Sequence, residues 1–259
     1  MQGIGDLLRE VDVALILVAD GEKSVNDLLK RTLQAHGHEI EIAYNGIDAL
    51  SKLRKRHPDL AIVGSALPLL DGTEVCRRVK ADPRLASTLL LLLASGSAIE
   101  DKIQSFEAGC DDYLAKPFDL AELRMRVRAL LRRVKKSAAL ACLSVGELSL
   151  DPQSFQVHVE GRTAQLTPMQ FELLSYLVTH TGQVLSTAQL LHEVWNYPPG
   201  VGNPGLVRVH IKNLRAKIER SPESPQYIQT VSRHGYKING GDSSSQPVEI
   251  AAYSMATAR

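Results

Sequence analysis

Acidic and basic side chains follow two of the apolar runs in this chain. Asp20 and Glu22 come directly after the run at residues 13–19, and Lys116 follows the short segment 112–115. Carboxylates are ligands for hard cations such as Mg²⁺, and an ammonium group neutralises the charge of a phosphoryl oxygen. If folding brings these three side chains together, they have the chemistry of a site that handles phosphate or a cation.

The first half of the chain repeats one strand-then-helix pattern. Strand-like segments at residues 13–19, 40–44, 60–63, 89–94 and 112–115 are each followed by apolar residues at helical spacing, at 25–33, 47–53, 75–79, 99–108 and 120–133. Such units predict an α/β fold, a five-stranded doubly wound parallel sheet in the flavodoxin-like order. Functional residues are then expected to gather where strands one and three end.

Three motifs resemble the receiver domain of two-component response regulators: LVADGE at 17–22, PDLAIVGSALPLLDG at 58–72 and AKPF at 115–118. The resemblance implies two acids that bind Mg²⁺, a phosphate-accepting aspartate, a Ser or Thr, and a Lys. The second acid is replaced by Gly21, the phosphoacceptor by Gly64 and the hydroxyl residue by Ala94. Glycine offers no nucleophile, so we expect an atypical receiver that acts independently of aspartyl phosphorylation.

Asp20, Glu22 and Lys116 are the receiver-pocket residues that are still present. We expect Lys116 to pair directly with Asp20, which offsets the desolvation of both charges without a metal. No cofactor is expected, and weak binding of Mg²⁺ is the alternative. Ser65 and Asp59 are poor substitute acceptors, because Ser65 points to the other strand face and Asp59 lies at the opposite strand end.

Two further hypotheses stay open for this half of the chain. One is a phosphorylation-dependent regulator with a non-standard acceptor, and the other is a pseudo-receiver that senses a small molecule or an adaptor protein. Tyr113 matches the aromatic residue that moves in phosphorylated receivers. Ala94 has no hydroxyl group that could move toward a phosphoryl group, so we expect the Tyr113 ring to keep one orientation. The alternative is a ring that simply fills a surface groove.

Charges in the fourth and fifth units resemble the face through which active receivers of this type form homodimers. The resemblance implies a dimer interface made by Lys102, Asp112, Glu122 and Arg126. The alternative is a solvated helix face, whose exposed ion pairs contribute little.

The second half of the chain has antiparallel and helical patterns. Alternating residues at 155–159 with a return at 163–166 predict a hairpin, and capping boxes at Thr167 and Ser186 begin two helices. The segment 204–220 is apolar on one face and almost entirely basic on the other, and a second hairpin follows. A one-sign face on a core-anchored helix favours contact with DNA, and the order of elements predicts a winged helix-turn-helix.

The motifs LTPMQFELL, LLHEVW, VRVHIKNLRAKIE and IQTVSRHGYKI resemble the effector domain of OmpR/PhoB-type regulators. This resemblance implies a transcriptional regulator, not an enzyme, that binds double-stranded DNA as a dimer on tandem half-sites. The implied DNA-binding residues are His210, Lys212 and Arg215 on phosphates, and Arg208, Val209 and Asn213 on base edges.

Two loops of this half are also implied in binding. Relatives carry a wing arginine where this chain has Ser232, so Arg233 is the residue expected in the minor groove. The loop Asn196–Asn203 matches the segment with which relatives contact RNA polymerase, and a plain connector is the alternative.

Composition sets bounds on these hypotheses. With 259 residues and a net charge of +1, the chain is long enough for two domains, and any DNA contact must come from local basic clusters. It has no apolar run of spanning length, no export-signal pattern and three scattered cysteines, so we expect a cytoplasmic protein without membrane contact. The expected organisation is an N-terminal extension at 1–12, a receiver-like domain at 13–135, a linker at 136–145, a winged helix at 146–239 and a disordered tail at 240–259.

Overall fold

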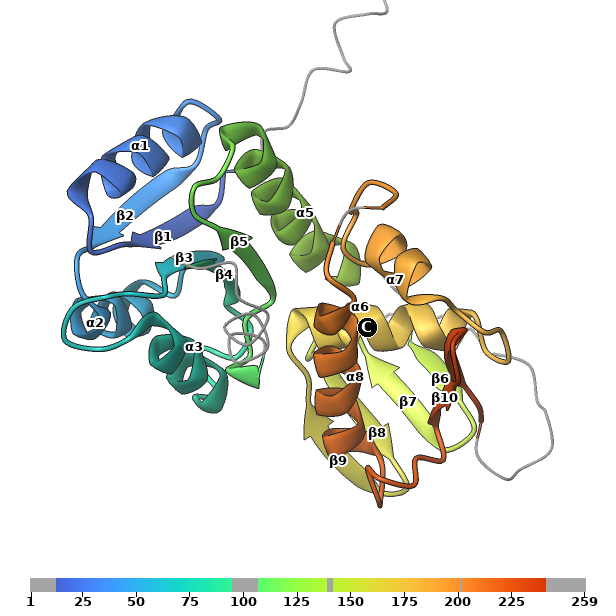
Figure 1. Ribbon diagram of the computed structural model, residues 1–259. Coiled ribbons are helices and arrows are strands. Elements are labelled where there is room, and N and C mark those ends of the chain that lie inside the picture. Colours follow the sequence, from blue (N-terminus) through green and yellow to red (C-terminus); the bar gives the residue numbers. More distant parts are fainter. Residues whose placement is uncertain (1–12, 95–106, 139–141, 201, 241–259) are drawn as a thin grey trace, which may run out of the picture. The chain divides into compact units, whose positions relative to one another are not determined.

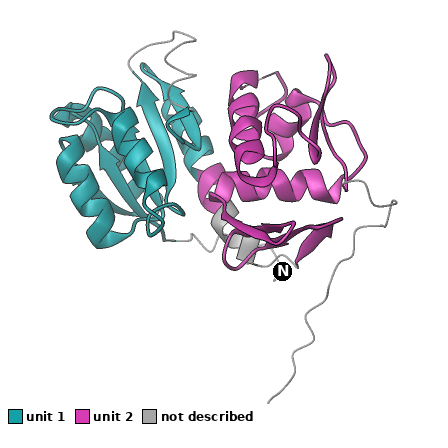
Figure 2. Cartoon of the chain, turned by 90° about the horizontal axis from the view of Figure 1, so that it is seen from below, with its two compact units in different colours: residues 1–127 teal, residues 128–259 magenta. Residues whose placement is uncertain are grey.

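The computed structural model describes residues 13–94, 107–138, 142–200 and 202–240. The chain splits into two compact units, Met1–Val127 and Arg128–Arg259 (Figure 2). Each unit has its own sheets and its own core.

Unit 1 is a parallel sheet with helices packed against it (Figure 1). The sheet has the order β2-β1-β3-β4-β5, which is the predicted doubly wound topology. Its strands are β1 (Leu15–Ala19), β2 (Glu39–Ala43), β3 (Leu60–Gly64), β4 (Leu89–Ala94) and β5 (Asp112–Ala115). The helices are α1 (Lys23–Gln34), α2 (Gly46–Arg56), α3 (Gly72–Ala81) and α5 (Leu120–Ala138). Most of the helix expected at 99–108 lies outside the described residues.

The strand register brings the carboxyl ends of the strands to one edge of this sheet. Ala19 of β1 pairs with Val63 of β3, and Gly64 pairs with Leu93 of β4. Every residue of β3 and β4 is buried, as expected for central parallel strands that are covered on both faces. Side chains that follow these strand ends are therefore held on a rigid support.

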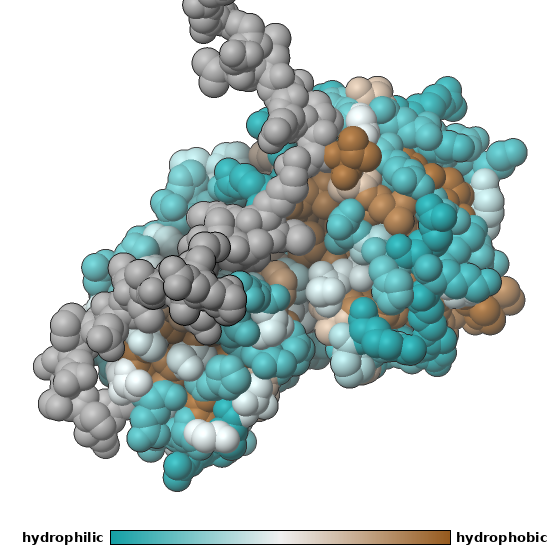
Figure 3. All heavy atoms as spheres, turned by 180° about the vertical axis from the view of Figure 1, so that it is seen from behind, coloured by the Kyte–Doolittle hydropathy of each residue, from teal (hydrophilic) through white to brown (hydrophobic). Residues whose placement is uncertain are grey.

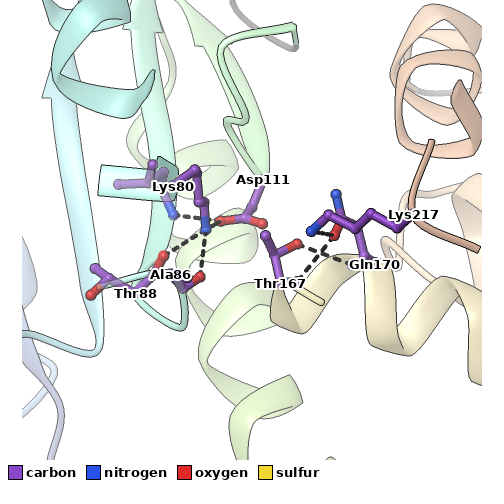
Figure 4. A network of polar contacts seen from close by, with 8 residues as sticks. Lys80, Ala86, Thr88, Asp111, Thr167, Gln170 and Lys217 are labelled. Carbon is purple, nitrogen blue, oxygen red and sulfur yellow. Dashed lines mark hydrogen bonds and ion pairs between the residues drawn. The ribbon is translucent and has the colours of Figure 1, made fainter. Parts of the chain in front are cut away.

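A buried ion pair fastens α3 to the sheet (Figure 4). The Lys80 ammonium donates to the Asp111 carboxylate at 2.8 Å and to the Thr88 carbonyl oxygen at 2.7 Å. The same carboxylate oxygen accepts the Leu90 N–H at 2.8 Å. Hydrogen bonds from several elements compensate the burial of both charges, so the pair connects α3 with β4 and with the segment before β5.

The described residues of unit 2 begin with the end of α5 and then form two antiparallel sheets and three further helices. The first sheet joins β6 (Leu143–Val145), β7 (Leu148–Asp151), β8 (Gln156–Val159) and β9 (Arg162–Gln165). The helices are α6 (Pro168–Thr179), α7 (Thr187–Glu193) and α8 (Pro204–Ile218), and the second sheet is the hairpin of β10 (Ile228–Val231) and β11 (Gly235–Ile238). Three helices followed by a two-stranded hairpin form a winged helix-turn-helix.

The helix starts in unit 2 follow local capping signals. The Thr167 side chain accepts the Gln170 N–H while Gln170 bonds back to the Thr167 N–H, which confirms the predicted capping box. Ser186 accepts the Gln189 N–H, and Asn203 caps α8 ahead of Pro204. These bonds satisfy N–H groups that have no partner inside the helix.

The structure differs from the expected boundary between the two domains. Within the segment 136–145 expected to be a linker, α5 continues to Ala138 and β6 occupies Leu143–Val145. Apolar residues occupy every second, buried position of β6 and β7, but a run of three or four residues is too short to show a period of two in the sequence. Residues 139–141 lie outside the described part of the chain.

Few large apolar side chains are exposed among the described residues. On the face drawn in Figure 3, hydrophilic residues cover most of the coloured surface and apolar residues lie between them. The exposed large apolar residues are Val13, Leu28, Tyr44, Ile47, Leu69 and Val184. None of the described helices combines the length and the apolar character needed to cross a membrane.

Candidate functional site

The pocket edge of unit 1 brings together the three charged residues expected there. The Lys116 ammonium lies 2.8 Å from Oδ2 of Asp20 and 3.2 Å from Oε1 of Glu22. Side-chain exposure is 3% for Asp20, 17% for Lys116 and 67% for Glu22, so the pair with Asp20 is the shielded one. The predicted direct pairing of Lys116 with Asp20 is confirmed.

Asp20 is held through both its side chain and its backbone. Its Oδ1 accepts the Glu22 N–H at 3.0 Å, and Asn26 on α1 donates to the Asp20 backbone carbonyl at 2.7 Å. Its Oδ2 is buried and receives no aligned hydrogen bond, so the charge of Lys116 is what compensates this oxygen. Desolvation opposes the charge on Lys116, but Asp20 and then Glu22 outweigh it and leave the pKa of Lys116 raised.

Gly64 leaves room that the Asp20 carboxylate fills. A Cβ placed on Gly64 would lie 2.5 Å from Asp20 Oδ2 and 3.1 Å from its Cγ. The space beside the end of β3 is therefore occupied by a neighbouring carboxylate that is already paired with Lys116. A side chain at position 64 would have to displace Asp20.

These residues do not fit a magnesium site. Gly21 and Gly64 offer no side-chain ligand, and Asp20 is engaged by the Lys116 ammonium at 2.8 Å. Mg²⁺ prefers oxygen ligands in octahedral geometry, and an ammonium group in contact with the carboxylate repels it. Throughout the described part of the chain, no three His, Cys, Asp or Glu side chains are grouped so that they could hold a metal ion.

Two of the remaining pocket residues, Ala94 and Tyr113, are buried, whereas Asp59 lies at the opposite edge of the sheet. Ala94 ends β4 with 3% exposure, and Tyr113 has 7% exposure, so its ring does not lie in an open surface groove. Asp59 lies at the opposite edge, where its Oδ2 accepts the Leu15 N–H at 2.9 Å. Asp59 is therefore too far along the strand to replace the missing acceptor.

The charges expected at a dimer interface are used inside unit 1. Arg126 donates to both carboxylate oxygens of Asp112, at 2.9 and 3.1 Å, and to Glu122 at 2.6 Å. Arg126 and Asp112 are 7% and 3% exposed. Asp112 thus pairs with Arg126 across β5 and α5, and Glu122 pairs with Arg126 within α5. The pairing of these side chains with a second copy stays a prediction, and it would compete with these intramolecular bonds. Lys102 lies outside the described residues.

In unit 2 the basic face of α8 is narrower than predicted. Arg208 and Lys212 are exposed, and Asn213 is half-buried. Val209 and His210 are 7% and 3% exposed, so little of either side chain is available for the DNA contact predicted for it. The His210 ring packs 5.3 Å from the Trp195 ring, centroid to centroid.

Two other basic side chains of α8, Arg215 and Lys217, form hydrogen bonds within unit 2. Arg215 donates to the Ile228 carbonyl and to the Thr230 hydroxyl. Lys217 donates to the Gln165 carbonyl and to Gln170 Oε1, each at 2.7 Å (Figure 4). The predicted phosphate contact by Arg215 therefore competes with bonds inside unit 2.

The acid at the end of α8 does not neutralise the exposed face. Glu219 is 4% exposed, and its carboxylate accepts the N–H groups of Gln226, Tyr227 and Ile228. Because this charge is buried and fully engaged, the outward face keeps the positive character of Arg208 and Lys212. A positive face on a rigid helix is suited to the phosphates and base edges of a DNA groove.

The wing presents Arg233 at the tip of its hairpin. Arg233 is exposed and has a φ of 64°, in the left-handed region. Gly235 follows with a φ of 141°, and a Cβ there would overlap the Leu185 carbonyl. Leu185 and Tyr236 exchange backbone hydrogen bonds at 2.8 and 3.0 Å, so the close approach at Gly235 lets the wing pair with the segment before α7.

The loop between α7 and α8 has an anchored base. Tyr197 is 4% exposed, and its carbonyl lies 2.8 Å from His192 Nδ1. Gly202 has a φ of 105°, and a Cβ there would overlap the Tyr197 ring. The residues at 198–200 are exposed, so a short proline-containing tip is presented on this base.

Comparisons with known proteins agree with both units. Residues 16–128 match the response regulator receiver domain, and residues 161–238 match the C-terminal domain of transcriptional regulatory proteins. The DNA-binding dual master transcriptional regulator RpaA of Synechocystis sp. is 39% identical over 225 residues, which are 85% of this chain and 93% of the relative. The alkaline phosphatase synthesis transcriptional regulatory protein PhoP of Bacillus subtilis is 38% identical over 86% of this chain and 95% of its own length.

A solved structure supports the fold alone. A cysteine-to-aspartate mutant of RitR is 23% identical, with a TM-score of 0.69 over 88% of this chain and 99% of its own.

A receiver sheet followed by a winged helix with a basic outer face defines the class of DNA-binding response regulators. With relatives of this identity and coverage, the chain belongs to the OmpR/PhoB family of transcriptional response regulators.

Proposed function

We propose that this regulator binds its target DNA without aspartyl phosphorylation. The observation that carries the proposal is the Asp20 carboxylate, which fills the space beside Gly64 and is paired with Lys116 at 2.8 Å. A phosphoryl group needs a nucleophile and cation ligands at this edge, and neither is offered by Gly64, Gly21 or Ala94. The filled space also argues against a small-molecule sensor at the same place.

The test is selection of DNA by the untreated protein. Purified protein is incubated with a random pool of double-stranded oligonucleotides, and bound sequences are enriched and footprinted before and after treatment with acetyl phosphate. We expect the same sequences and the same affinity in both states, with no aspartyl adduct detected by mass spectrometry. Selective binding that appears only after an adduct forms would contradict the proposal.

We infer that Arg208 and Lys212 contact DNA in the major groove. Both are exposed on α8, whose opposite face is anchored in the core. Lys212→Ala should weaken binding to all sequences and lower the salt slope by about 1, whereas Arg208→Ala should change the preferred base at one position. Lys55→Ala, which removes an exposed charge from unit 1, is the matched control and should change neither quantity.

We further propose that two copies bind tandem half-sites. The exposed basic face of a single α8 is short, and one small DNA-binding module buries too little surface for high specific affinity. Two copies on adjacent sites raise the effective concentration of the second module. Binding should be cooperative on two half-sites and weak on one, as measured by gel shift. Equal affinity for both DNAs would exclude this arrangement.

We propose RNA polymerase as the partner of the Asn196–Asn203 loop. The support is its exposed tip at 198–200 on a base anchored by the buried Tyr197. Replacing Pro198 and Pro199 with alanine should leave DNA binding unchanged and should change the yield of transcription in vitro. An unchanged yield would identify the loop as a connector.

A further inference from the structure

Arg215 on α8 and Glu219, which directly follows the last residue of α8, hold the wing. Arg215 donates from Nε and Nη2 to the Ile228 carbonyl at 3.0 and 2.7 Å, and from Nη2 to the Thr230 hydroxyl at 2.8 Å. Glu219 accepts the Ile228 N–H at 2.8 Å. Both the carbonyl and the N–H of Ile228, the first residue of β10, are thus bound by charged side chains at the C-terminal end of α8.

The wing depends on such attachments because it is small. A two-stranded hairpin is marginally stable by itself, and β10 and β11 pair over only four residues each. The Glu219 carboxylate also accepts the N–H groups of Gln226 and Tyr227 at the entry to β10. Charge-assisted bonds of this kind are stronger and more directional than neutral ones.

We propose that Arg215 is a positioning residue, which fixes the wing and its tip Arg233 relative to α8 rather than binding a DNA phosphate itself. The planar guanidinium uses its Nε–Nη2 edge for the wing, and turning this edge to a phosphate would release the Ile228 carbonyl. The affinity contributed by Arg233 then depends on Arg215. This inference rests on the DNA binding of the family and deepens the proposed interface.

The experiment is a double-mutant cycle on the full chain with its selected DNA. Arg233→Ala is expected to weaken binding about tenfold, the loss of one charge-assisted contact. Arg215→Ala should weaken binding by at least the same factor, and the double variant should be no weaker than Arg215→Ala alone. Lys212→Ala combined with Arg233→Ala is the matched control, whose two losses should multiply.

Arg215→Lys separates the two roles of the charge. Lysine keeps the positive charge but cannot bind the Ile228 carbonyl through two nitrogens, so a positioning role predicts a loss as large as that of alanine. Thermal melting and circular dichroism establish that each variant folds. If Arg215→Ala does not fold, Thr230→Val removes one of the three bonds from Arg215 and should reduce the contribution of Arg233.

The outcomes are distinct. Multiplicative losses for Arg215→Ala and Arg233→Ala, or full affinity in Arg215→Lys, would overturn the positioning role while the wild-type protein still binds DNA. A wild-type protein that selects no DNA would overturn the proposed function together with this inference.

Discussion

The space at Gly64 makes a specific stability prediction. In Gly64→Ala the new methyl group would lie 2.5 Å from Asp20 Oδ2, well inside van der Waals contact. The carboxylate is short and buried, so it can escape only by rotating away from Lys116. The substitution should therefore break the ion pair without changing any charge.

The magnitude follows from two opposing effects. Breaking a buried ion pair costs roughly 3–5 kcal/mol, but Lys116 keeps 17% exposure and a second partner in Glu22, so about 2 kcal/mol is the expected loss. Replacing glycine with alanine within a strand returns up to about 1 kcal/mol of backbone entropy. The net change is a destabilisation of about 1–2 kcal/mol, or roughly 4–8 °C in Tm for a domain of this size.

Calorimetry and urea unfolding of the wild-type protein, Gly64→Ala, Lys116→Met and the double variant test this prediction. In Lys116→Met the pair is already absent, so Gly64→Ala should cost little there, and the coupling energy should be about 1–2 kcal/mol. A Gly64→Ala protein that is as stable as the wild type, or more stable, would refute the view that Asp20 is held in this space by Lys116.

Three further predictions concern backbone strain and titration. Leu69 has a φ of 66° with 76% exposure, so Leu69→Asn should raise the urea midpoint by relieving about 1 kcal/mol of left-handed strain, and a lower midpoint would contradict this. Gly235→Ala should destabilise unit 2 by about 2–3 kcal/mol and speed amide exchange in the wing, because its Cβ overlaps the Leu185 carbonyl; normal exchange rates would oppose it. Burial, followed by the Glu160 charge, raises the pKa of Tyr227 to about 12 from 10.0, so unfolding releases a proton between these values and stability should fall as pH rises through this window. Absorbance titrations of the wild-type protein and of Tyr227→Phe should differ by one phenol group that ionises at about pH 12. Identical titration curves would contradict the raised pKa of Tyr227.

The local patterns of this chain determine most of its fold. The apolar runs that end at Asp20 and Gly64 predict buried parallel strands, and both are found there. Thr167 with Gln170, and Asn203 with Pro204, mark helix starts through bonds that span only a few residues. Such signals are readable in the sequence because their physical cause lies within one turn of the chain.

The pocket was also predictable in part. The pairing of Lys116 with Asp20 follows from the topology, since strand ends of a parallel sheet meet at one edge and opposite charges there need partners. The Asp20 carboxylate in the space beside Gly64 was not predictable, because a glycine pattern does not tell which neighbour fills the room it leaves.

The roles of the charged and polar residues on α5 and α8 were decided by tertiary packing. Arg126 donates hydrogen bonds to Asp112, fourteen positions away in the sequence, and Arg215 donates to the Ile228 carbonyl, thirteen positions away. Helical spacing predicts which residues share one face of a helix. Whether that face is buried or exposed depends on the other elements that pack against it. His210 is buried and its ring packs against that of Trp195, a neighbour that cannot be inferred from the sequence of α8 alone.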